Sequence, residues 1–233
     1  MKKILSVLFA LALLCSAALA EAALEPLHTM YQIIPSYDSA VGMYYAEVVN
    51  TGDTLICLDS ELSRVEVLDA QGNVLATEAI YSTVPTVLAP GETGYVVPFY
   101  MYLDGVDVSA LTDYAIHLYA EEASYYEPTN YLNANAISAE IRTEPDSWGD
   151  DVTSLYITFT NTTADVVYDF HFALGVYDES GALIYTCEES TYDVGIPSGQ
   201  SVIVRSEIDS MITSYWAENG ITPASIGVIG YQN

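Results

Sequence analysis

The sequence predicts an all-β protein built from two tandem antiparallel β-sandwiches that arose by an internal duplication. The stretch VLDAQGNVLAT, residues 67–77, is nearly repeated as VYDESGALIYT, residues 176–186. Both copies belong to regions in which apolar and polar residues alternate, and no window of comparable length carries a helical stripe. The matching positions on either side keep a spacing of 108 to 111 residues: Asn50-Thr51 with Asn161-Thr162, Gly91 with Gly199, and Leu111-Thr112 with Ile221-Thr222. A repeat of this length is a domain, and is too long for a solenoid unit.

Each copy predicts the same strands in order. The first alternating run of the second copy places Leu155, Ile157 and Phe159 on one face, and the matching residues of the first copy are Tyr44, Ala46 and Val48. The next strand of the second copy carries an apolar face from Phe170 to Val176, while His171 and its alternate neighbours are expected to point outward. The last strands, near residues 116–118 and 226–228, alternate in the same way.

Turns separate these strands at matching places. Residues 69–72 and 178–181 both begin with Asp and end with Gly, which suits a hairpin turn with a positive φ at its last residue. Residues 90–92 and 198–200 form a second pair of turns. A short helix is expected at residues 210–219.

About seven short strands in roughly 100 residues is typical of an immunoglobulin-like sandwich. We therefore expect two such domains, at residues 24–122 and 134–233, joined by a linker at residues 123–133. The linker length is compatible with both a rigid rod and a bent pair.

The first 20 residues have the layout of a secretory signal peptide. Lys2 and Lys3 precede a largely apolar run, and Ala18-Leu19-Ala20 offers a cleavage site before Glu21. The run is shorter than the roughly 18 apolar residues of a membrane-spanning helix. The prediction is an extracellular, secreted protein that is either released or associated with the cell surface, with no membrane insertion after cleavage.

The chain without this leader is strongly acidic. It holds three arginines, no lysine and 32 acidic residues, which gives a net charge of −29. Such a polyanion repels nucleic acid and anionic surface polymers, so neither is expected as a partner. The charge can serve solubility alone, or it can attract cations or a basic partner.

Catalytic motifs are missing from the sequence. The three histidines, His28, His117 and His171, lie far apart, and no HExxH or GxSxG pattern occurs. Cys57 and Cys187 fall at non-equivalent places in the two copies, which favours two separate buried thiols over a disulfide. A hydrolase with a carboxylate pair remains an alternative, but the sequence predicts a protein that is not an enzyme.

Two candidate sites remain. Glu144, Asp146, Asp150 and Asp151 gather in one acidic loop and could hold calcium, although the twelve-residue calcium-loop pattern is missing and no other cofactor is expected. Tyrosine is abundant, at 20 residues, and Tyr125, Tyr126 and Tyr131 cluster at the linker as a possible binding surface. Tyrosine is also a favoured strand residue, which accounts for much of the excess.

The stretch FALGVYDESGALIY with the later turn IPSGQS resembles FxLYD-type and related immunoglobulin-like domains of secreted Gram-positive bacterial proteins. VEVLDAQGNVLA and LAPGET in the first copy are similar to it, with Ser63 where the second copy has Phe172. The resemblance covers about the middle 50 residues of each copy and implies an extracellular, non-catalytic module.

The sequence thus predicts a secreted binding or structural module with an unknown protein or glycan ligand. The alternatives are a calcium-stabilised extracellular spacer and a hydrolase.

Overall fold

The computed structural model describes residues 22–36, 39–97 and 100–232. The predicted signal peptide, residues 1–20, lies outside the described residues. Within the described part of the chain, no helix has the length and apolar character needed to cross a membrane.

The fold is mainly β, with 56% of residues in strands, and the strands form several antiparallel sheets. The all-β prediction is therefore confirmed. Every named strand pairing stays within residues 24–122, called here the first half, or within residues 130–232, called the second half.

The first half contains three sheets. One has the order β1-β2-β8-β6, with β9 also paired to β2, and the others have the orders β10-β4-β5 and β11-β3-β7. The bounds are β1 Leu24–Ser36, β2 Ser39–Asn50, β3 Ile56–Leu58, β4 Arg64–Asp69, β5 Val74–Ala79, β6 Thr83–Val84, β7 Val87–Leu88, β8 Thr93–Val96, β9 Met101–Tyr102, β10 Leu111–His117 and β11 Ala120–Glu122, with the 3-10 helix η1 at Val108–Ala110.

The second half contains two sheets, with the orders β12-β18-β15-β16 and β13-β14-β17. The bounds are β12 Asn130–Tyr131, β13 Ile137–Pro145, β14 Asp151–Thr160, β15 Phe170–Asp178, β16 Leu183–Thr191, β17 Ser201–Glu207 and β18 Pro223–Gln232, with the 3-10 helix η2 at Ala134–Ala136 and the helix α2 at Ser210–Asn219.

Helix α2 was predicted at these residues, and its ends have identifiable caps. Asp209 accepts a hydrogen bond from the Met211 backbone N–H, and Gly220 ends the helix in the left-handed conformation at φ 66°. Ile212 and Trp216 are its buried residues and attach it to the second half.

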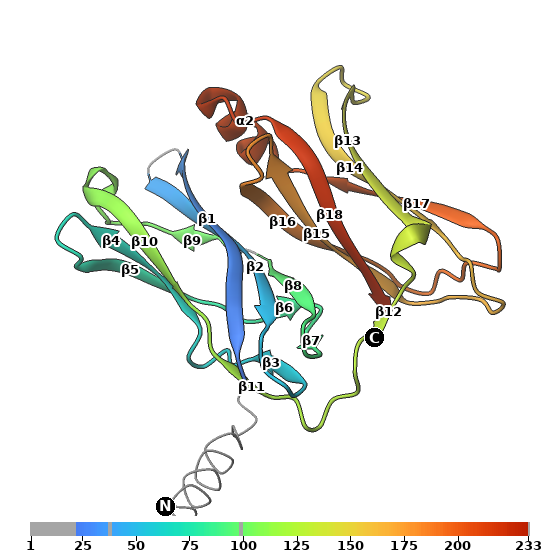
Figure 1. The fold of residues 1–233 in the computed structure, drawn as a ribbon. Helices are drawn as coiled ribbons and strands as arrows, with labels where there is room; N and C mark the ends of the chain where they lie inside the picture. Colours follow the sequence, from blue (N-terminus) through green and yellow to red (C-terminus); the bar gives the residue numbers. More distant parts are fainter. Residues whose placement is uncertain (1–21, 37–38, 98–99, 233) are drawn as a thin grey trace, which may run out of the picture.

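The four main sheets lie as successive layers (Figure 1). The sheet of β1, β2 and β8 faces the sheet of β15, β16 and β18, while β4-β5-β10 and β13-β14-β17 form the outer layers. Strand β2 is buried on both faces, because Tyr44 lies in the core of the first half and Tyr45 packs against Tyr185 of the second half. The halves therefore pack face to face instead of forming an extended rod.

A slot in the second half receives a side chain of the first. Gly175 and Gly227 are cross-strand partners on β15 and β18. A Cβ added at Gly175 would lie 2.5 Å from the Tyr95 ring, and one added at Gly227 would lie 2.5 Å from its hydroxyl. Tyr95 is almost completely buried there, and its hydroxyl contacts that of Tyr177 at 3.1 Å. Only glycine at both positions leaves this space open.

Further polar contacts join the two halves. The Gln32 side chain donates to the Ile184 carbonyl at 3.2 Å, and the Thr186 hydroxyl donates to the Val96 carbonyl at 2.6 Å. The Tyr177 hydroxyl donates to Glu47 at 2.8 Å. These groups are largely removed from water, so their pairing fixes the relative position of the halves.

This packing changes one expectation drawn from the alternation. The face of β15 that carries His171 was expected to point outward, but His171 is buried and stacks on Tyr231 with ring centroids 5.1 Å apart. Both cysteines are buried and free, as predicted for two separate thiols. Burial raises the pKa of the Cys187 thiol to about 12.

Candidate binding groove between the two halves

A groove opens where β1 and β10 of the first half approach helix α2 of the second. Its volume is about 250 Å³, and we call it the tyrosine groove; its lining residues are Tyr31, Ile33, Val67, Leu111, Thr112, Asp113, Tyr114 and Tyr215. A cavity of about 170 Å³ shares Tyr215 with it and is also lined by Ile34, Met211, Ser214 and Glu218. Ligand sites often lie at such junctions between packed units.

Tyr31 is positioned by a glycine on the neighbouring strand. Its ring lies over Gly42 of β2, where a Cβ would come within 2.0 Å of the phenol oxygen. The hydroxyl contacts the Met101 sulfur at 3.7 Å. Tyr31 is thereby held flat against the sheet, with its ring stacked on Tyr114 at a centroid distance of 5.6 Å and an interplanar angle of 28°.

Tyr114 follows a bulge in β10, where the register with β4 shifts between Leu111 and Asp113. A bulge redirects the side chains that follow it. The Tyr114 hydroxyl lies 3.3 Å from both the hydroxyl and the carbonyl oxygen of Thr29. Asp113 accepts a hydrogen bond from the Tyr114 backbone N–H at 2.8 Å; the residue is exposed and is part of the groove lining.

The second half contributes Tyr215 from α2. The neighbouring residue Trp216 is buried against Tyr185, which fixes the rotation of the helix and turns Tyr215 toward the first half. Burial raises the pKa of Tyr215, and it raises the pKa of Tyr31 to about 12. Both phenols are therefore neutral at physiological pH, and Asp113 is the charged residue of the lining.

The predicted linker tyrosines differ in their surroundings. Tyr125 is 99% exposed and Tyr126 is 57% exposed, in the turn after β11. Tyr131 instead lies on β12, and its hydroxyl donates to Glu92 of the first half at 2.8 Å. Tyr126 lines a separate cavity of about 360 Å³, together with Thr86, Val87, Glu127, Pro128, Thr129 and Gln232.

The acidic loop that could hold calcium is a closed hairpin turn. The Asp146 carboxylate accepts the backbone N–H groups of Trp148 and Asp150 at 2.7 and 3.0 Å, and these bonds lower its pKa. Within residues 22–36, 39–97 and 100–232, no three His, Cys, Asp or Glu side chains gather to hold a metal ion. The structure therefore does not bring Glu144, Asp146, Asp150 and Asp151 together as one ligand set.

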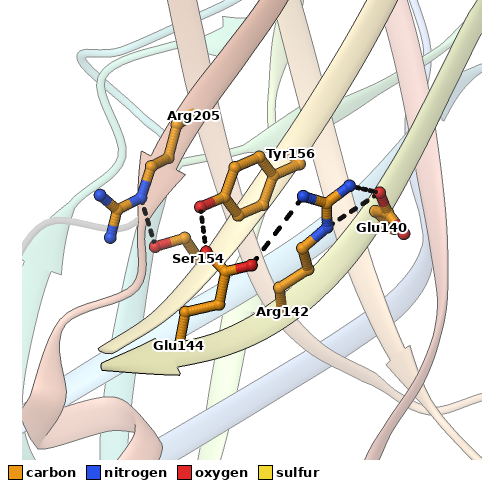
Figure 2. A network of polar contacts seen from close by, with 6 residues as sticks. All are labelled: Glu140, Arg142, Glu144, Ser154, Tyr156 and Arg205. Carbon is orange, nitrogen blue, oxygen red and sulfur yellow. Dashed lines mark hydrogen bonds and ion pairs between the residues drawn. The ribbon is translucent and has the colours of Figure 1, made fainter. Parts of the chain in front are cut away.

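Glu144 belongs to a network on the outer face of β13, β14 and β17 (Figure 2). It accepts the Tyr156 hydroxyl at 2.9 Å and lies 4.0 Å from Arg142. The Arg142 guanidinium lies 4.4 Å from the centre of the Tyr156 ring and also bonds Glu140. Arg205 lies on the other side of the network and donates to Ser154 at 3.0 Å.

Each arginine of the described chain lies near a glutamate. Arg64 donates to Glu66 at 2.7 Å, Arg142 donates to Glu140, and an Arg205 nitrogen lies 4.0 Å from Glu207. The protein therefore offers an anionic ligand little unpaired positive charge. The arrangement favours neutral or cationic ligands.

A further cavity between the halves, of about 320 Å³, carries several carboxylates. Three of them accept hydrogen bonds within the protein: Glu188 from the Tyr231 hydroxyl at 2.6 Å, Glu189 from the Ser206 hydroxyl, and Asp209 from the Tyr100 hydroxyl at 3.0 Å. The fourth, Glu207, lies 4.0 Å from Arg205. These bonds hold the wall of the cavity in place. They do not form the nucleophile, base and orienting acid of a catalytic triad.

The tyrosine groove could not be found from sequence spacing, because Tyr31 and Tyr114 come from β1 and β10 of the first half and Tyr215 comes from helix α2 of the second. The tyrosine excess was a general signal, but the positions depend on how the halves pack. No protein-family model matches the chain, and no curated protein matches it. The resemblance to FxLYD-type domains stays a prediction.

Calcium is expected to leave the melting temperature of residues 21–233 unchanged, because the Asp146 carboxylate is already used by its own turn. Thermal unfolding with excess calcium, and then with a chelator, measures this, and a monovalent salt of equal ionic strength is the control. A ligand that binds only the folded state raises its stability. A calcium-specific rise of several degrees would contradict the expectation and restore the calcium-stabilised spacer.

Proposed function

We propose that this chain is a secreted, non-catalytic binding or structural module that acts at or outside the bacterial cell surface, and that its two halves are duplicated immunoglobulin-like sandwiches. The leader-like residues 1–20 support export. The tyrosine groove carries the binding proposal, because it is a concave, aromatic-lined surface at the junction of the two packed halves.

Strand order supports the duplication. The sheet β10-β4-β5 of the first half has the same order as β18-β15-β16 of the second half, and β1-β2-β8 has the same order as β13-β14-β17. In both halves the middle hairpin turns on an aspartate, Asp69 or Asp178, whose carboxylate accepts backbone N–H groups within the turn. Two unrelated sandwiches would not share both features by necessity.

A buried asparagine supports the same conclusion. In the first half Asn50 is completely buried at the end of β2. Its amide nitrogen donates to the Thr54 carbonyl at 2.8 Å and to the Leu88 carbonyl at 2.9 Å, and its side-chain oxygen accepts the Gly52 N–H at 2.9 Å. One side chain thus joins the loop after β2 to the end of β7.

The second half repeats this network around Asn161, at the end of β14. The Asn161 amide donates to the Asp165 and Ile196 carbonyls, both at 2.7 Å, and its oxygen accepts the Thr163 N–H at 2.9 Å. Each bond has its counterpart around Asn50, at a spacing of 108 to 111 residues. A shared ancestor explains this agreement directly.

The binding proposal is tested with residues 21–233 on a biosensor, exposed to defined oligosaccharides and to heptapeptides of acidic, neutral and basic composition. Ligands found in this way are expected to lose at least about tenfold in affinity with Tyr114→Ala or Tyr215→Ala, because aromatic anchors supply much of the contact energy of a binding site. Tyr125→Ala is the matched control, since that tyrosine is almost fully exposed outside the groove.

The outcomes separate three possibilities. Loss of binding with the groove variants alone supports the proposal. Loss with Tyr125→Ala alone would move the binding surface to the linker tyrosines. If no compound in either panel binds, the groove is not a site for these ligand classes and the proposal fails.

A further inference from the structure

We propose that the tyrosine groove binds a cationic side chain, an arginine or a lysine, of a basic partner polypeptide. This inference rests on the proposed binding function and names its ligand class. It is carried by three observations: the charge around the groove, the tyrosine rings in it, and its size.

The charge of the groove is negative. Asp113 lines the groove, and Glu218 lines the neighbouring cavity, with which the groove shares Tyr215. Among the described residues, no arginine or lysine contributes to either lining. The chain after residue 20 carries a net charge of −29. This field attracts cations and speeds their approach, so charge complementarity selects a basic partner over a neutral or acidic one.

The aromatic lining provides a second attraction. A guanidinium or ammonium group over the face of a tyrosine ring is attracted by the ring quadrupole. The chain already contains this contact, because Arg142 lies 4.4 Å from the centre of the Tyr156 ring beside Glu144. Tyr114 and Tyr215 with Asp113 offer the same combination in the groove, without the arginine, while the Tyr31 ring lies between Gly42 and Tyr114.

The size of the groove fits a side chain better than a larger molecule. Pockets for drug-sized ligands have volumes of about 300 to 1,000 Å³, and the tyrosine groove has about 250 Å³. Ile33 and Leu111, which are partly exposed, supply apolar surface for the methylene stem of the side chain, and Asp113 is the acidic residue of the lining for its charged end. Lysine and arginine pack their stems on apolar surface in this way.

The test uses two blocked pentapeptides, Gly-Gly-Arg-Gly-Gly and the same peptide with citrulline, which keeps the shape of arginine and removes its charge. Binding is followed by NMR on protein carrying 13C-labelled tyrosine rings, with the groove rings assigned from single variants. The arginine peptide is expected to shift the Tyr31, Tyr114 and Tyr215 signals, and the citrulline peptide is expected to bind at least about tenfold more weakly.

Two variants separate a local site from long-range attraction. Asp113→Asn is expected to weaken arginine-peptide binding about tenfold, because it removes the carboxylate at the groove. Asp53→Asn removes the same charge from an exposed loop outside the groove and is expected to change the affinity less than twofold. Thermal unfolding checks that both variants are folded.

Three results would overturn the inference. Equal binding of the arginine and citrulline peptides would leave a binding groove but reject the cationic ligand. Equal losses with Asp113→Asn and Asp53→Asn would show attraction by net charge without a site. Absence of binding by the arginine peptide, while an oligosaccharide of the panel shifts the same tyrosine signals, would identify a neutral glycan groove instead.

Discussion

Replacing Gly175 by alanine is expected to lower the free energy of unfolding by about 2 kcal/mol, because the added methyl group would overlap the buried Tyr95 ring. Gly227→Ala has a related effect through a different atom, since its Cβ would meet the Tyr95 hydroxyl at 2.5 Å. Urea unfolding of each variant measures both losses.

Substitutions of Tyr95 distinguish the effects of Gly175→Ala and Gly227→Ala on stability. Tyr95→Phe removes only the hydroxyl, so it is expected to relieve most of the cost of Gly227→Ala and little of the cost of Gly175→Ala. Tyr95→Ala leaves a cavity and costs about 3 to 5 kcal/mol alone, but in that background neither glycine substitution is expected to cost much. Strictly additive losses in these double-mutant cycles would show that Tyr95 does not occupy the slot.

Asn50→Ala and Asn161→Ala are each expected to lower the free energy of unfolding by about 3 kcal/mol. Each substitution removes one buried hydrogen bond, to the Leu88 or the Ile196 carbonyl, and two part-buried ones, and a buried polar group that loses its partner costs about 1 to 3 kcal/mol. The losses are measured by urea unfolding followed by circular dichroism.

Asn73→Ala provides the control, because Asn73 lies in an exposed hairpin turn and its side chain bonds Asp69 there. Its substitution is expected to cost less than about 1 kcal/mol. Both buried asparagine variants are also expected to keep a single unfolding transition, because one apolar cluster contains residues of both halves, Tyr45 and Tyr185 among them. Similar small losses at all three positions would contradict the role assigned to the buried networks.

Local chemistry explains which parts of this fold were predictable. Leu155, Ile157 and Phe159 alternate with polar residues and are buried as the period of a strand requires. The hairpin glycines Gly72 and Gly181 have φ values of 79° and 83°, which their turns required. Helix α2 could be placed because Trp216 offered it an apolar face to bury, which Ile212 extends.

The contact between the halves was not predictable in the same way. His171 and Gly175 read as an ordinary outward face, since nothing in one strand indicates that a second sheet covers it. Tyr45 likewise alternates with Tyr44, and both are completely buried, one on each side of β2. Whether such a face is buried depends on packing between segments that are distant in the sequence. The tyrosine groove depends on the same packing, so local spacing could not indicate it.

The face-to-face contact has a consequence for assembly. The contact is heterologous, because the sheet β1-β2-β8 of the first half packs on β18-β15-β16 of the second half and not on its own counterpart, β13-β14-β17. When such a contact repeats without closing, it produces an open filament. Under the proposed duplication, the position of Tyr95 corresponds to Ile203 on the far outer sheet, and that of Gly175 corresponds to Glu66 on the opposite one.

The two ends of this short stack therefore lack the residues that join its middle. Glu66, paired with Arg64, occupies the position where a slot would be needed, and the network of Arg142 covers the face that would have to enter the next slot. Charged side chains on outer sheets oppose further sheet-to-sheet association. Under the proposed duplication, the two copies differ at the positions that form the junction, and the outer sheets carry Glu66 and Ile203 where the middle sheets carry Gly175 and Tyr95.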